Sequence, residues 1–301
     1  MEQSMPSPRL SSQNPAVSQD AGGWYGFWQH PQHTETFDVH ATLDARNLCR
    51  AYEAYNDVRL LREWLVPPQR QAALLEVGCA TGEFARYVQL RYPRLRYTGI
   101  DVSQTAIDRA KAKYPQQRFL LTDPAIPLAN VWNQRESARP EIVYSKDVAH
   151  HQVDPLSFIS QLVRLGSDMV ILRVRTRDVG PTQWDPEKSC QYLYGGWMPY
   201  IVMTLQELVD HLRSEAPSAE IVVRRHHLVL GGQNNRLLPK ECYLPQTGTA
   251  ETAVGVFQTT TQAGRVTVTD QRDGTPRYTW DFLARLAWRR LQTRLREVSR
   301  A

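Results

Sequence analysis

The stretch that decides the fold is LLEVGCATGEF, residues 74–84. It continues an apolar run that begins at residue 72, turns at Gly78 and Gly82, and leads into a helical segment. Gly78 allows a tight turn, and Gly82 lets the following helix begin close to a ligand, because glycine has no Cβ. This pattern predicts the first strand–turn–helix crossover of a doubly wound α/β sheet, in which ligands bind beyond the carboxyl ends of the strands.

The same alternation of strand and helix continues along the chain. Apolar strand patterns recur at 96–102, 118–121, 141–145 and 168–174, separated by helical patterns or capping signals. Such alternation predicts a parallel sheet with helices on both faces. Two later strands bring the expected total to seven, and a small hairpin is expected around Asp273-Gly274; these strands are predicted at 221–230 and 253–259.

Composition shifts divide the chain into four parts. The first is rich in Ser, Pro and Gln, the second is helical, the third holds the strand–helix alternation, and the fourth ends in a basic amphipathic helix from Trp280. Inside the third part, residues 178–200 form an insertion dense in Pro, Gly, Tyr and Trp. The expected parts are a disordered leader at 1–23, an N-terminal helical lid at 24–69, a ligand-binding domain at 70–262, and a C-terminal hairpin and helix at 263–301.

Composition also excludes several classes of protein. With 42% hydrophobic and 22% charged residues, the chain has the balance of a soluble globular protein. No apolar stretch approaches the ~20 residues of a membrane helix, and the four widely spaced cysteines predict neither a metal site nor disulfides, so we expect a cytoplasmic protein. Of the net charge of +5, residues 280–301 supply +4 (six Arg, one Asp, one Glu), and the remainder shows no polyanion-binding composition.

The glycine turn does not fit a dinucleotide-binding loop. That fingerprint needs glycine at positions 78, 80 and 83, where this chain has Gly78, Ala80 and Glu83. A carboxylate at position 83 would also repel a pyrophosphate at the helix N-terminus. Two other acids accompany the turn: Glu76 precedes it and Asp101 ends the second strand. These features disfavour NAD and FAD.

The turn and Asp101 instead resemble motif I and the ribose-binding acid of class I S-adenosylmethionine (SAM)-dependent methyltransferases, with Ala80 in place of the middle glycine. The resemblance implies a Rossmann-like, doubly wound seven-stranded α/β sheet, mostly parallel with one antiparallel strand near an edge. It also implies SAM as cofactor, since a carboxylate such as Asp101 can accept both ribose hydroxyls. The predicted cofactor residues are Glu76, Gly78, Cys79, Ala80, Gly82, Phe84, Asp101, Val102, Thr122, Asp123, Lys146 and His151.

A second segment, YSKDVAHHQVDP at residues 144–155, resembles the small-molecule (methyltransferase-11/12-like) branch of that family. The resemblance covers about residues 70–175. It implies an enzyme that methylates an oxygen or nitrogen of a small-molecule acceptor, in a biosynthetic pathway. Asp147, His150 and His151 are the candidate catalytic residues, since histidine titrates near neutral pH. The alternative is a structural or cofactor-packing role, which we prefer for His151.

Candidate substrate residues come from two places. Arginine occupies every second position at the end of the fifth strand, at Arg173, Arg175 and Arg177, so the three side chains share one face. Arg173 and Arg175 would clamp a carboxylate or phosphate of the substrate. The alternative is that they simply face solvent. Aromatic residues before the first strand and in the 178–200 insertion would wall a flat or apolar acceptor; their alternative is core packing. The aromatic candidates are Tyr25, Trp28, Tyr194 and Trp197.

Two other functions stay open at this level. An RNA methyltransferase would use the Arg-rich C-terminal helix, and a binding or scaffold protein would keep the fold without turnover. The motif Asn-Pro-Pro-Tyr does not follow the fourth strand, where the chain has Lys146-Asp147-Val148-Ala149. In the families that the sequence resembles, this absence argues against exocyclic amines of bases and glutamine amides as acceptors. We therefore expect a small-molecule partner and no nucleic acid, membrane or metal, and leave a homodimer open.

Overall fold

A computed structural model describes most of the chain. The described residues are 26–30, 34, 42–65, 71–133, 138–178, 180–193, 196–226 and 249–271. The predicted leader, the turn at Asp273-Gly274, the C-terminal helix, Tyr25 and Tyr194 lie outside them.

Strands and helices alternate through the middle of the chain, as the sequence predicts. The strands are β1 Ala72–Val77, β2 Leu95–Asp101, β3 Arg118–Leu121, β4 Ile142–Lys146, β5 Met169–Arg177, β6 Cys190–Leu193, β7 Gly196–Pro199, β8 Met203–Thr204, β9 Glu220–His226, β10 Thr249–Phe257 and β11 Val266–Gln271. The helices are η1 Gly26–Gln29, α3 Ala45–Glu53, α4 Asn56–Trp64, α5 Glu83–Arg91, α6 Gln104–Lys113, α7 Leu128–Asn133, η3 Ala149–His151, α8 Pro155–Leu165 and α9 Leu205–Glu215.

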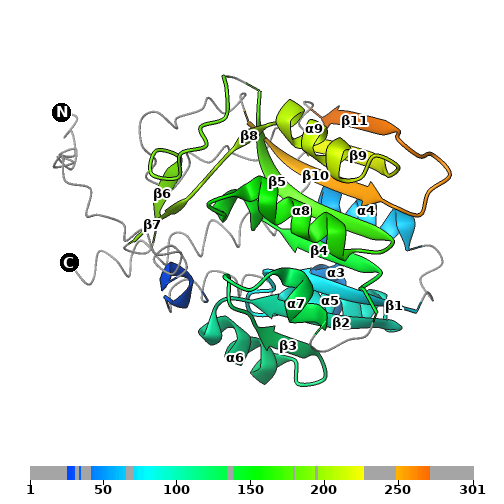
Figure 1. Ribbon diagram of the computed structural model, residues 1–301. Helices are drawn as coiled ribbons and strands as arrows, with labels where there is room; N and C mark the ends of the chain where they lie inside the picture. The colour runs from blue at the N-terminus through cyan, green and yellow to red at the C-terminus, as the bar shows by residue number, and fades with distance from the viewer. Residues whose placement is uncertain are drawn as a thin grey trace, which may run out of the picture.

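The main sheet is mixed, with the order β11-β9-β10-β5-β4-β1-β2-β3, and β8 pairs with β5 beside this path (Figure 1). Strand β10 is antiparallel to β5 and to β9, whereas the other pairings are parallel. The prediction of a doubly wound, mostly parallel α/β sheet with an antiparallel strand near one edge is confirmed. All seven predicted strands are present, and β8 and β11 raise the described sheet to nine strands.

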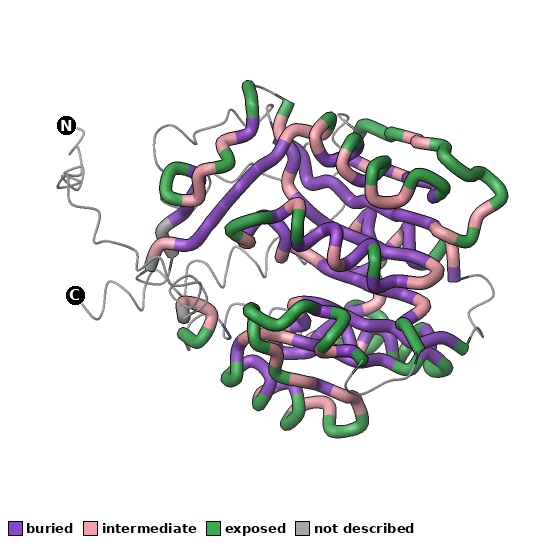
Figure 2. The backbone as a smooth tube through the Cα atoms, in the orientation of Figure 1, coloured by how far each residue is buried: buried purple, intermediate pink, exposed green. Residues whose placement is uncertain are grey.

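Helices cover both faces of the sheet, and each face has its own apolar core. Helices α3, α4 and α5 pack on one face, and α7, α8 and α9 pack on the other (Figure 1). Side chains of a strand alternate between faces, so Leu74 enters the first core and Leu75 the second. All six residues of β1 are buried, which is normal for a central parallel strand, and Figure 2 shows that its neighbours β2 and β4 are buried over most of their length.

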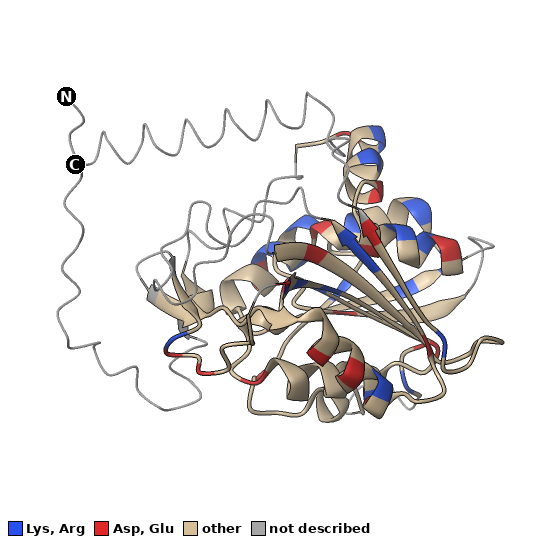
Figure 3. Cartoon of the chain, turned by 90° about the horizontal axis from the view of Figure 1, so that it is seen from above, with Lys and Arg blue, Asp and Glu red and all other residues tan. Residues whose placement is uncertain are grey.

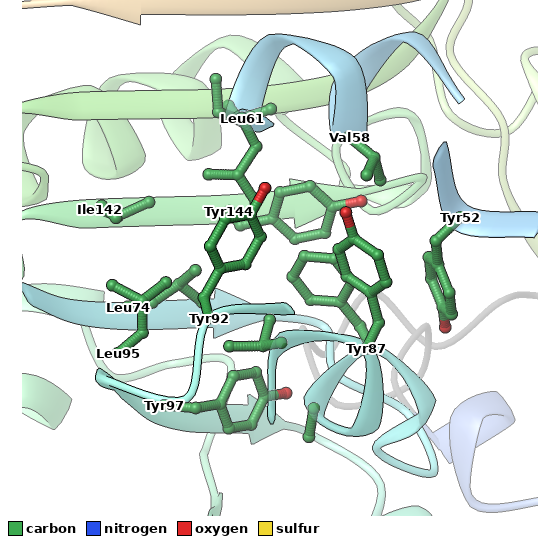
Figure 4. Close-up of a cluster of buried hydrophobic side chains, with 14 of the residues drawn as sticks. Tyr52, Val58, Leu61, Leu74, Tyr87, Tyr92, Leu95, Tyr97, Ile142 and Tyr144 are labelled. Atoms are coloured by element: carbon green, nitrogen blue, oxygen red, sulfur yellow. The ribbon is translucent and has the colours of Figure 1, made fainter. Parts of the chain in front are cut away.

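The core under α3–α5 is unusually rich in tyrosine (Figure 4). Tyr52 stacks on Tyr87 with ring centroids 5.1 Å apart, and Phe84 stacks on Tyr144 at 4.2 Å. A buried phenol needs a hydrogen-bond partner, because leaving its hydroxyl unpaired costs free energy. The Tyr144 hydroxyl donates to Asp57, at the start of α4. This layer therefore carries polar groups toward the carboxyl ends of the strands.

The segment predicted as a lid divides into two parts. Helices α3 and α4 lie on the face of the sheet, where Leu48, Leu60 and Leu61 join the core. The short helix η1 lies instead at the carboxyl ends of β2 and β4, where it contacts α6 and β7. Of the segment predicted as a lid, η1 lies at the edge of the sheet where a ligand would bind, whereas the apolar sides of α3 and α4 pack on the face of the sheet.

Capping residues begin several helices at the carboxyl edge. The Ser103 hydroxyl accepts from the Ala106 amide at the start of α6, and Asp154 caps α8. Thr204 and Glu207 form the predicted capping box of α9. Within the described residues, no helix has the length and apolar character that crossing a bilayer requires. Basic and acidic residues lie interspersed over the helices and strand ends in Figure 3.

Candidate active site

The turn between β1 and α5 depends on its glycines. Gly78 and Gly82 have φ values of +82° and +80°, in the left-handed region that favours glycine. A Cβ on Gly78 would lie 2.2 Å from Val148 Cγ2, and one on Gly82 would lie 2.7 Å from Phe119 Cζ. Ala80 also has a positive φ, +46°, which is the conformation that a glycine would adopt without strain. The two glycines therefore allow Val148 and Phe119 to pack directly against the backbone of the turn.

Asp101 connects this turn to the end of β2. One carboxylate oxygen accepts from the Ala80 amide at 2.8 Å, and the other accepts from the Ser103 amide at 2.9 Å. Burial raises the pKa of Asp101, and these backbone N–H groups oppose that shift. Each oxygen has two lone pairs, so the carboxylate can still accept two further hydroxyl groups. Asp101 thus fits the ribose-binding role that its position predicts.

Glu76 lies behind the turn, in the tyrosine-rich core. The Tyr97 hydroxyl donates to its carboxyl group, and the side chain is buried. Burial raises the pKa of Glu76 to about 8, although the Tyr97 hydrogen bond and the charge of Lys146 act the other way. At neutral pH the group is therefore mostly protonated, which removes a negative charge from the neighbourhood of Lys146.

Asp147 follows β4 with a positive φ of +59° and forms a two-point ion pair with Arg173. Burial alone would raise the pKa of this carboxyl, but the Arg173 guanidinium holds it well below the usual range. A carboxylate held ionised in this way is a weak proton acceptor. The arrangement favours a positioning role for Asp147 over proton transfer in the predicted catalytic site.

Arg173 is correspondingly occupied by groups of its own chain. Its side chain is buried, it pairs with Asp147, and its Nη1 lies 3.6 Å from a Glu251 oxygen on β10. Its guanidinium carbon also lies 4.6 Å from the centroid of the Tyr55 ring. An arginine held by two internal carboxylates is not placed as the substrate clamp that the alternating arginines suggest.

His150 and His151 are buried in η3, directly after β4. The Nδ1 atom of His151 lies 2.9 Å from the Pro199 carbonyl oxygen. A carbonyl only accepts, so Nδ1 carries the proton, and in the neutral form of the ring Nε2 is then an acceptor. Trp28 lies edge-on to His151 with centroids 5.2 Å apart, and Tyr200 lies 5.2 Å from His150. Three distant segments therefore meet around the histidine pair.

Gln29 is a residue that the sequence does not single out. Its side-chain amide donates to the Val102 carbonyl at 2.7 Å and accepts from the Gln104 amide at 3.0 Å. These two backbone groups lie just after Asp101, while the neighbouring Trp28 contacts His151 on the other side. Helix η1 therefore spans the carboxyl edge from β2 to the segment after β4. A single glutamine carries no periodic or motif signal, so only the fold reveals this bridge.

The other predicted site residues occupy varied places. Phe84 and Cys79 are buried in the tyrosine-rich core, and burial raises the pKa of the Cys79 thiol. Asp123, after β3, is exposed and accepts from the Ala125 amide at 2.8 Å. The remaining predicted residues within the described part of the chain are half-buried: Val102, Thr122, Arg175 and Trp197. No three His, Cys, Asp or Glu side chains of the described residues are grouped to hold a metal ion.

Comparison with known proteins agrees with this geometry. Residues 75–168 match the profile of a methyltransferase domain. The chain carries a class I SAM-dependent methyltransferase domain. The match covers β1 to the loop before β5, which includes the glycine turn, Asp101 and the histidine pair.

Curated relatives of the methyltransferase domain are trans-aconitate 2-methyltransferases. The protein from Methylobacterium radiotolerans is 24% identical over 113 residues, which are 38% of this chain and 41% of the relative. The protein from Variovorax paradoxus is 28% identical over 116 residues, 36% of this chain and 42% of the relative. The chain thus matches about two fifths of the length of these relatives.

Among solved structures, two methyltransferases align with most of this chain. The magnesium protoporphyrin IX methyltransferase of Synechocystis PCC 6803 with bound SAM has a TM-score of 0.47 and 14% identity, over 77% of this chain and 94% of that one. A plantazolicin methyltransferase in complex with an analogue and S-adenosylhomocysteine (SAH) has a TM-score of 0.48 and 15% identity, over 77% and 93%.

The residues at the carboxyl edge fit the cofactor of this domain class. Gly78 and Gly82 form the tight turn at the end of β1, where Val148 and Phe119 leave no room for a Cβ, and Asp101 keeps lone pairs for two hydroxyls. When bound, SAM supplies an activated methyl group on a sulfonium centre. The contribution of the protein is then to hold the donor and acceptor in line, because proximity and orientation dominate such a transfer.

Proposed function

We propose that this methyltransferase domain transfers a methyl group from SAM to an oxygen or nitrogen atom of a small-molecule acceptor. The observation that carries the proposal is the aromatic and imidazole cluster around His151, beside the glycine turn. The rings of Trp28, His150 and Tyr200 lie against the His151 ring, and the Nδ1 atom of His151 bonds the Pro199 carbonyl oxygen. Such walls exclude water and suit a small, flat acceptor.

Within this proposal, each group has a separate task. Asp101 binds the ribose hydroxyls, and the glycine turn after β1 holds the methionine part of the donor. Nε2 of His151 accepts a proton when the acceptor is a hydroxyl or an amine. An acceptor that is already a carboxylate needs no base, because it is an anion at neutral pH. The names of the trans-aconitate relatives make carboxylic acids the first acceptors to test.

The experiment follows methyl transfer from labelled SAM. The purified chain is incubated with small carboxylic acids including trans-aconitate, with phenols, with amines and with total RNA. We expect label in one small-molecule class, with one SAH formed per methyl transferred. SAH binding without transfer to any acceptor would favour the binding-protein alternative, and transfer to RNA alone would favour the nucleic-acid alternative.

A pair of histidine variants tests the proton acceptor. His151→Ala is expected to lower kcat on a hydroxyl or amine acceptor by about 10²–10⁴-fold, the usual contribution of general base catalysis. His211→Ala is the matched control, because His211 bonds Ser160 between α8 and α9 on the face of the sheet. Equal kcat values for His151→Ala and the wild type would remove His151 from the mechanism.

A further inference from the structure

A pair of cations stands at the carboxyl ends of β4 and β5. Lys146 and Arg173 are register partners in adjacent parallel strands. The ring of Tyr55, the residue before α4, contacts both: the Lys146 ammonium lies 4.2 Å and the Arg173 guanidinium carbon 4.6 Å from its centroid. Tyr52 lies 5.5 Å from the same ammonium. The aromatic layer therefore holds the lysine over the sheet rather than leaving it to extend into water.

Two buried arginines near this end of the sheet, Arg173 and Arg225, have carboxylate partners. Arg173 on β5 pairs with Asp147 and Glu251, and Arg225 on β9, beyond β10, pairs with Asp178 and Asp270. These ion pairs neutralise the guanidinium groups within the protein. An added anion would have to displace an internal carboxylate to bind either of them.

Lys146 differs, because it forms no ion pair with any residue that the structure describes. The two acids whose charges act on it are Glu76 and Asp147. Glu76 is mostly protonated at neutral pH, and both oxygens of Asp147 face Arg173. A half-buried ammonium over aromatic rings is only weakly solvated, so it gains strongly from an anion brought by a ligand.

The position of Lys146 indicates which ligands reach it. Strand β4 is paired with β1, with Val77 opposite Ser145, so Lys146 lies level with the start of the glycine turn. It therefore lies between the turn that receives the methyl donor and the η3 segment that carries His151. In the proposed reaction, a carboxylate of either the donor or the acceptor would therefore lie within reach of Lys146.

We propose that Lys146 binds a carboxylate group of a ligand at this site, either the amino-acid carboxylate of the cofactor or a carboxylate of the acceptor. Lys146, and not its register partner Arg173, is then the residue that binds the carboxylate of the ligand. Arg173 acts as a positioning residue that holds Asp147, and through it the backbone that follows Lys146. This inference rests on the proposed function, and it adds the charge and chemical class of the group that is bound.

The test compares three probes on Lys146→Met, which keeps a long apolar stem against Tyr55 and removes the charge. SAH carries the amino-acid carboxylate, 5′-methylthioadenosine lacks it, and trans-aconitate is added to the SAH-saturated protein. Binding of each probe is measured by titration calorimetry. Lys188→Met is the matched control, because Lys188 is exposed and pairs with Asp185 on the surface. Equal melting temperatures of the two variants confirm that both are folded.

The three probes separate the two sources of the carboxylate. If the cofactor supplies it, SAH affinity falls about tenfold or more and methylthioadenosine affinity is unchanged. If the acceptor supplies it, SAH affinity is unchanged and trans-aconitate affinity falls by a similar factor. In either case Lys146→Arg restores most of the loss. The proposal would be overturned if wild type and Lys146→Met bound all three probes with equal affinity. The same holds if the two proteins have equal affinities for SAH and for methylthioadenosine and neither binds trans-aconitate. Because the readout is binding, a failure of methyl transfer is detected separately.

Discussion

The glycine turn offers a prediction whose magnitude follows from the coordinates. Replacing Gly78 by alanine adds a Cβ at φ +82° and places it 2.2 Å from Val148 Cγ2. The left-handed backbone costs an L-residue roughly 1–2 kcal/mol, and overpacking costs roughly 1–3 kcal/mol. We therefore expect Gly78→Ala to lower the free energy of unfolding by roughly 2–5 kcal/mol.

A second glycine separates the two costs. Gly264 has a φ of +73°, and a Cβ there would meet nothing closer than a Pro217 carbonyl oxygen at 3.6 Å. Gly264→Ala therefore changes only the backbone terms, which include the lower entropy of the unfolded chain. The difference between the two variants isolates the contact with Val148, at roughly 1–3 kcal/mol.

The assay is urea unfolding followed by tryptophan fluorescence, with free energies from linear extrapolation. Val148→Ala alone is expected to cost about 1 kcal/mol, because it removes two methyl groups from a half-buried side chain. In the Gly78→Ala/Val148→Ala double variant the contact is removed. Its loss of unfolding free energy should therefore be roughly 1–3 kcal/mol smaller than the sum of the losses of the two single variants. A coupling energy below about 0.5 kcal/mol would refute the argument, because it would mean that Val148 does not restrict this position.

Three further outcomes are expected. Asp101→Ala should weaken SAH binding more than tenfold, because the ribose loses its acceptor; unchanged affinity by calorimetry would contradict this. Gln29→Ala should speed SAH dissociation in stopped-flow fluorescence, because η1 loses both bonds to the end of β2; the exposed Gln206→Ala is the control, and equal rates for all three proteins would exclude a covering role. Glu76 has its pKa raised to about 8, so the folded state keeps a proton that the unfolded state releases, and wild-type stability should fall between about pH 5 and pH 8. Glu76→Gln should abolish that slope in urea unfolding, and parallel slopes would show that another group is responsible.

The fold and the cofactor end of the site follow largely from local patterns. The strand–helix alternation and the predicted caps at Ser103, Asp154 and Thr204 are all found in the structure. The hydrophobic period and capping chemistry act over a few neighbouring residues, so a sequence displays them directly. Strand β8 escapes prediction because it has two residues. Strand β11 falls within the predicted C-terminal hairpin, but its parallel pairing with β9 is a tertiary event that the sequence does not display.

Charged residues of the site were harder to interpret. Three alternating arginines indicate a shared face, and β5 does carry Arg173 and Arg175. The pattern does not show that Arg173 is already paired with Asp147 and Glu251, nor that Lys146 is left over Tyr55. A charge pattern gives the sign and the face, whereas the partner depends on which other strands and helices pack there.

By itself the sequence determined the glycine turn, Asp101 at the end of β2 and the order of strands and helices, because backbone conformation and burial periodicity are set by each residue and its near neighbours. Only the tertiary structure decided which polar groups meet. Gln29 bonds a carbonyl 73 residues away, and Tyr144 bonds a carboxylate 87 residues away. Such pairs form only after the helices pack on the sheet, because the residues between the two partners do not determine how the helix and the strand are positioned against each other.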